Sequence, residues 1–154
     1  MQRWSLFRRA IAEDVGTASL EFVTAGMILL LPMVYLVLTM AALQAGSLAV
    51  EGAARHAARL YVQAPDTRDA EAEAERAIRF ALADYGLDPS EASVGISCSP
   101  RPADCLRRRA IVTITVEVSV GLPLVPSALT IGGPLSVPLR STATEQVSRF
   151  WGAQ

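Results

Sequence analysis

The most constraining feature of this chain is a stretch without charged side chains, residues 22–50, which is 29 residues long. As an α-helix it would span roughly 43 Å, at a rise of about 1.5 Å per residue. The hydrocarbon core of a bilayer is about 30 Å thick and needs about 20 residues. The apolar core of a secretory signal peptide is much shorter, roughly 7–15 residues. The stretch therefore predicts a transmembrane helix that projects beyond one face of the membrane.

Neither the proline in this stretch nor the flanking arginines change or refine that assignment. Pro32 removes the hydrogen bond to the carbonyl of Ile28, so we expect a bend there, which membrane helices tolerate. The positive-inside rule does not orient the helix, because each flank carries three arginines. They are Arg3, Arg8 and Arg9 before the stretch, and Arg55, Arg59 and Arg68 after it.

The composition excludes several functional classes. The chain has 154 residues, with 14 Lys+Arg against 15 Asp+Glu and a net charge of −1. That length allows one small domain, and the charge balance argues against nucleic acid as a partner. The sole histidine, His56, removes most histidine-based metal and triad chemistry. The sequence shows no nucleophile–base pair, phosphate-binding glycine loop or metal-ligand set. We therefore predict no enzymatic activity, no catalytic residue, no metal and no cofactor.

A short motif stands directly before the uncharged stretch. An arginine-bearing leader, residues 1–16, ends at Gly16, and Glu21 occupies the fifth position counted from Thr17, just before Phe22. An acidic side chain costs about 2.5–3.5 kcal/mol at the centre of a membrane helix and less near its end. Such a residue usually has a partner. In the simpler interpretation, it is an acid favoured at the N-terminal turn of a helix by the macrodipole.

This motif resembles the prepilin leader of type IV pilin-like proteins, in which a basic leader ends in glycine and glutamate follows at the fifth mature position. Residues 18–22 (ASLEF), Pro32 and residues 51–59 (EGAARHAAR) are more closely similar to the TadE-like family. Its members are minor pseudopilins of the tight-adherence (Tad, or Flp) pilus system. The resemblance covers residues 13–62 well. Beyond them it is limited to two nearby cysteines followed by β-strands.

The resemblance implies cleavage between Gly16 and Thr17 by a prepilin peptidase, and a role for Glu21 and Phe22 in assembly. The Glu21 carboxylate would pair with the new N-terminal amine of a neighbouring subunit, which offsets part of the desolvation of both groups. The resemblance also implies a cytoplasmic leader, an exported C-terminal part and a role in assembling a Flp-type pilus or secretion apparatus. The partners would be other pilins or pseudopilins, the Tad membrane platform and the lipid bilayer. The alternative is an unprocessed single-pass membrane protein with a small partner-binding ectodomain.

The predicted fold class is α+β: a long N-terminal transmembrane helix, then a small exported domain of one helix and a short antiparallel sheet. The domains expected are a leader at 1–16, a transmembrane and stem helix at 17–62, and the exported domain at 63–154. Alanine recurs every fourth residue along the stem, which places these side chains on one helix face. The row either forms a packing ridge for another pseudopilin or reflects the abundance of alanine. Its members are Ala41, Ala45, Ala49, Ala53 and Ala57.

Four further elements are expected in the exported domain. A helix at 69–85, capped by Asp66 or Thr67, carries an apolar stripe. Strands are expected at 92–98, at 110–120, where apolar residues alternate with polar ones, and, more weakly because of two prolines, within 135–147. The apolar face of this sheet is expected to pack on the second helix. The stripe comprises Ala74, Ile78, Ala81, Leu82 and Tyr85.

Two segments between the strands add to this prediction. Cys98 and Cys105 bracket a proline-rich loop in an exported domain, which favours a disulfide. A metal pair or a redox motif does not fit, because six residues separate the cysteines and no other ligands are present. The connection at 122–131 is apolar. It either covers a sheet edge or leaves a patch for a partner or a membrane surface.

Overall fold

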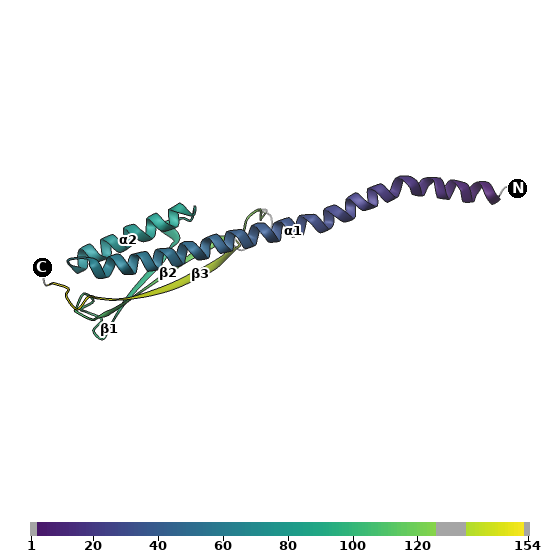
Figure 1. Cartoon of the computed structure of the whole chain (residues 1–154). Coiled ribbons are helices and arrows are strands. Elements are labelled where there is room, and N and C mark those ends of the chain that lie inside the picture. The colour runs from purple at the N-terminus through teal and green to yellow at the C-terminus, as the bar shows by residue number, and fades with distance from the viewer. Residues whose placement is uncertain (1–2, 126–134, 153–154) are drawn as a thin grey trace. The chain divides into compact units, whose positions relative to one another are not determined.

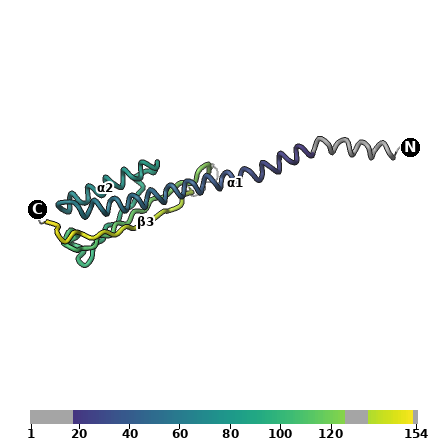
Figure 2. The backbone as a smooth tube through the Cα atoms, viewed as in Figure 1, coloured from purple at the N-terminus to yellow at the C-terminus, as the bar shows by residue number. Residues whose placement is uncertain are grey.

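A computed structural model of the chain describes residues 3–125 and 135–152, with side chains described from residue 18 onward (Figures 1 and 2). The chain divides into two compact units, Met1–Thr39 and Met40–Gln154. The first unit contains only helix α1 (Arg3–Gln63), which continues into the second. The second unit also holds α2 (Thr67–Asp84), a short 3₁₀ helix η1 (Pro89–Glu91) and three strands. The chain is thus α+β.

Helix α1 is long and apolar enough from Ala18 onward to cross a membrane, and none of its most apolar 18-residue window is buried. The helix passes through Pro32. Two hydroxyls in this region are bonded within the helix, Thr24 Oγ1 to the Leu20 carbonyl at 2.7 Å and Thr39 Oγ1 to the Tyr35 carbonyl at 2.9 Å. Such internal bonds satisfy polar groups that lipid cannot.

The start of α1 differs from expectation. The stem helix is predicted to begin at Thr17. In the structure α1 begins at Arg3, so most of the predicted leader is helical and runs without a break into the stem. The physical reason is that the leader contains no proline, and the one glycine, Gly16, disfavours helix by only about 1 kcal/mol relative to alanine.

Strands β1 (Ser93–Ser99), β2 (Ile111–Gly121) and β3 (Ser136–Gln146) form an antiparallel sheet in the order β1-β2-β3. Each lies within one residue of its predicted position. Along β2 the even-numbered side chains are buried and the odd-numbered ones are partly or fully exposed, so one sheet face is apolar and the other polar. Of the two prolines that weakened the third prediction, Pro138 lies in β3 and is tolerated because β3 is an edge strand, whereas Pro134 lies outside the described residues.

Helix α2 is bounded by the expected signals. The Asp66 side chain accepts a hydrogen bond from the Asp69 backbone N–H at 2.9 Å, and Gly86 adopts a positive φ of 70° just after the helix. The predicted stripe is confirmed at Ala74, Ile78 and Leu82, which are buried. Ala81 is partly buried against the core, and Tyr85, the C-cap residue, is half-exposed.

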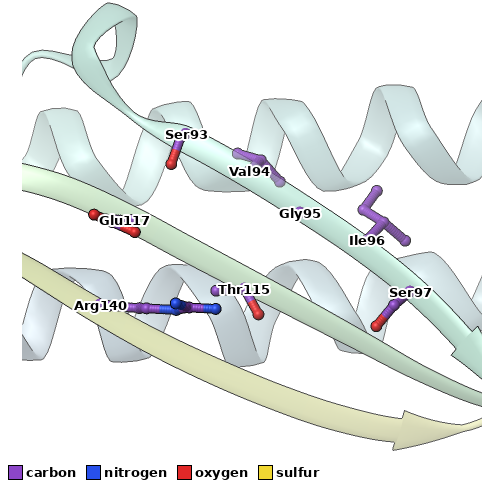
Figure 3. A pocket seen from close by; sticks show the side chains of 8 residues that line it. All are labelled: Ser93, Val94, Gly95, Ile96, Ser97, Thr115, Glu117 and Arg140. Atoms are coloured by element: carbon purple, nitrogen blue, oxygen red, sulfur yellow. The ribbon is translucent and has the colours of Figure 1, made fainter.

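The core lies between the apolar face of the sheet and two helices, rather than against α2 alone as expected. The C-terminal half of α1 supplies seven of its buried residues, and α2 lies alongside it (Figures 1 and 3). At Gly46, a Cβ would lie 2.7 Å from Val120 Cγ2 and 2.9 Å from Leu139 Cδ1, so only glycine allows this approach of α1 to β2 and β3. The α1 residues are Ala49, Val50, Ala53, Ala54, Ala57, Ala58 and Tyr61, and buried Ala64 follows directly after the helix.

The far end of this core is closed by the C-terminal segment. The Trp151 indole Nε1 donates a hydrogen bond to the Ala64 carbonyl at 3.0 Å, and Arg108 Nε donates to the Trp151 carbonyl at 2.9 Å. Nearby, burial raises the pKa of the Tyr61 phenol, and the negative charge of Glu71 raises it further. These contacts join the end of α1 to the sheet.

Candidate functional site

The predicted cleavage and assembly residues all lie on α1. Gly16 and Thr17 are helical, and their side chains are outside the described part. Glu21 and Phe22 are exposed, Phe22 by 79%. Neither ion pair formed among the described side chains involves Glu21, since these pairs are Arg55–Glu51 and Arg76–Glu73. An exposed carboxylate at the edge of an apolar helix surface can accept a cation from another molecule.

The alanine row does not form one continuous free surface. Ala49, Ala53 and Ala57 have at most 1% of their surface exposed and pack in the chain's own core. These three residues are therefore covered within the chain's own core, and their contact with a neighbouring subunit stays a prediction. Only Ala41, which is exposed, and Ala45, which is partly buried, lie at positions that another helix could reach.

A second buried row on α1 was missed by the sequence reasoning. Val50, Ala54, Ala58 and Tyr61 also recur at helical spacing and are buried. Together with the first row they make the apolar surface of α1 wide enough to meet two elements at once. The sequence signal was present, since two adjacent rows of small residues indicate a helix covered on two sides rather than one narrow ridge.

The disulfide prediction is confirmed. Cys98, the one buried residue of β1, is bonded to Cys105 in the β1–β2 connection, with a Cα–Cα distance of 5.2 Å. The next residue, Leu106, is buried in the core. The bond therefore ties the connection to the edge of the sheet at the point where it re-enters the core.

Breaking this bond by the double substitution Cys98→Ser with Cys105→Ser is expected to lower the free energy of unfolding by about 2.5 kcal/mol, because the closed eight-residue ring no longer restricts the unfolded chain. Denaturant unfolding of the full chain in detergent micelles measures the loss, and reducing the unsubstituted protein should reproduce it. Quantitative alkylation of both cysteines without reductant would contradict the bond.

The polar face of the sheet carries small side chains and few charges. Figure 3 shows a hollow on it, lined in part by Ser93, Gly95 and Ser97 of β1, with Glu117 of β2 and Arg140 of β3 beside them. Two hydroxyl pairs link β2 to β3, Thr113 to Thr144 at 3.2 Å and Thr115 to Thr142 at 3.1 Å. Such a surface is typical of a solvated sheet face.

Among the side chains described, those of residues 18–125 and 135–152, no group of three or more His, Cys, Asp or Glu could hold a metal ion. The arrangement is therefore described by surfaces rather than by a reactive centre: an exposed apolar half of α1 with Glu21 at its edge, and a packed α+β unit. Of the apolar connection predicted at 122–131, residues 126–131 lie outside the described part.

Comparison with known proteins gives no match: no family model, curated protein or solved structure is significantly similar to this chain.

Proposed function

We propose that this chain is a TadE-like minor pseudopilin that is held in the membrane by α1 and assists assembly of a Flp-type pilus or a related secretion apparatus. The observation that carries the proposal is the order Gly16, Thr17, Glu21 immediately before an exposed apolar helix. A prepilin peptidase would cleave after Gly16. The leader would remain cytoplasmic and the α+β unit would be exported.

The difference in burial between the two halves of α1 supports this proposal. The apolar half has no partner within its own unit, since its side chains up to Leu38 are all exposed among those described. The other half builds the core of the second unit. A helix that is apolar on all sides and unburied needs lipid or other helices around it. A membrane, and neighbouring pilin-like helices with which Glu21 can pair, would supply both.

Cleavage is tested by Gly16→Ala. Glycine leaves room for close approach of a protease to the backbone, so the added methyl group is expected to slow or abolish maturation. The chain would be co-expressed with a prepilin peptidase, and mass spectrometry of its N-terminus would report the fraction beginning at Thr17. The matched control is Gly26→Ala, which adds a methyl group to the same helix with nothing within 4 Å and should mature normally.

Two results would overturn the proposal. An N-terminus at Met1 after co-expression would show that the leader is retained. One near residues 45–49 would show cleavage by a different peptidase, behind the apolar stretch. If cleavage occurs, Glu21→Ala should then impair pilus assembly without changing the mature N-terminus. Normal assembly by that variant would contradict the proposed pairing of Glu21 with a neighbouring subunit.

A further inference from the structure

The two ends of the sheet differ in charge. The β1–β2 connection, at the end closed by Trp151, carries five charged residues, Arg101, Asp104, Arg107, Arg108 and Arg109. At the opposite end, the β2–β3 hairpin has no charged residue anywhere from 118 to 139. The uncharged end retains exposed apolar side chains, with Leu124 73% and Leu135 49% exposed. An apolar surface left open at one end of a small domain indicates a further contact.

This uncharged end lies beside the uncharged part of α1. Val120 and Leu139, near the last residues of the paired strands, contact α1 at Gly46. Pairing continues to Gly121 and Ser136, and the Leu122 N–H donates to the Leu135 carbonyl at 3.0 Å. Figure 1 shows this end of the sheet reaching further along α1 than α2 does. The hairpin thus extends towards the start of the second unit, where α1 is still uncharged.

The distance along the sequence of α1 from the expected end of the membrane span to Gly46 is short. A span of about 20 residues that begins at Phe22 ends near Ala41, and Gly46 follows roughly 8 Å further along the helix. The headgroup region adds about 5–8 Å on each side of the hydrocarbon core. This short distance is compatible with contact between lipid and Leu122 and Leu124, which come after the last paired residues.

We infer that Leu122 and Leu124, which follow β2, and Leu135, which precedes β3, insert into the interface of the bilayer that α1 spans. The occupant is lipid because this surface lies beside an uncharged part of α1. No charged residue stands on α1 between Gly46 and Glu51, or on the strands between the paired Glu117 and Arg140 and this end. This second contact would fix the height of the sheet above the membrane. The inference rests on the membrane anchoring in the proposed function.

The test measures the surroundings of single nitroxide labels on the full chain in nanodiscs of phosphatidylcholine and phosphatidylglycerol. Labels at Leu124→Cys and Leu135→Cys report whether these two positions are surrounded by lipid or by water. Phe80→Cys is the matched control, because Phe80 is 71% exposed and lies on α2. Leu30→Cys marks the span. A maleimide label applied without reductant leaves the Cys98–Cys105 disulfide unlabelled. Power saturation compares molecular oxygen, which partitions into lipid, with a water-soluble nickel chelate.

The ratio of oxygen to nickel accessibility is expected to be several-fold higher at Leu124 and Leu135 than at Phe80, and highest at Leu30. If the Leu30 label is in lipid while the labels at Leu124 and Leu135 are accessible to the nickel chelate, the inference is wrong. The proposal that α1 spans the membrane would be unaffected. Protection of the hairpin labels from both reagents would mean that protein covers them, which also overturns it. If Leu30 is open to nickel, the anchor and the proposed function fail together with the inference.

Discussion

Replacing Ile114 with alanine is expected to lower the free energy of unfolding by about 2–5 kcal/mol, the usual cost of an Ile-to-Ala change in a packed core. Ile114 is fully buried at the middle of β2, the central strand. Its side chain belongs to the same core cluster as buried residues of α1 and α2. The cavity would therefore open where side chains from both helices and the sheet meet. Denaturant unfolding of the full chain in detergent micelles, followed by near-ultraviolet circular dichroism, measures the loss.

The matched control is Ile96→Ala. Ile96 is the residue paired with Ile114 across β1 and β2, but its side chain is 37% exposed at the edge of the sheet. Removing the same atoms there transfers less buried surface to water and leaves a site open to solvent, so the loss should be clearly smaller. Equal losses at the two positions would mean that the apolar face of the sheet is not covered by α1 and α2.

Much of the second unit could be predicted from the sequence because its signals are local. Alternation along β2 requires only that one face be buried, and the cap at Asp66 is a hydrogen bond within one turn. The disulfide followed from two cysteines close together in the chain. The position of Tyr85 was wrong because the helix ends one residue earlier, and side-chain periodicity ends with it.

The partner of the sheet could not be predicted in this way. The spacing of small residues on α1 shows that one face allows close approach, but not which surface approaches it. Gly46 illustrates the difficulty, since its role depends on Val120 and Leu139, which lie far along the chain. The same holds for Glu21, whose spacing from Gly16 is local while its partner in the proposed function is another molecule. Its role stays a prediction.

Replacing Ala53 with leucine is the second large-effect prediction, and it bears on how the alanine row is used. Ala53 lies on α1 and is fully buried in the core of the second unit, so a larger side chain there must displace its neighbours. Overpacking of this kind costs about 1–3 kcal/mol, and we expect a loss near 3 kcal/mol because three carbons are added at a site with no exposed surface. Thermal or denaturant unfolding of the isolated full chain would show it.

Ala41→Leu is the control, because Ala41 belongs to the same row but is exposed. Leucine and alanine are both good helix formers, so its effect on unfolding should be within about 0.5 kcal/mol. Any effect of Ala41→Leu should instead appear in assembly, where a larger side chain would keep a neighbouring helix at a distance. If Ala53→Leu left unfolding unchanged but blocked assembly, the row would serve a neighbouring subunit along its whole length. Since α2 and the sheet cover Ala53 in the folded chain, that neighbour would first have to displace them.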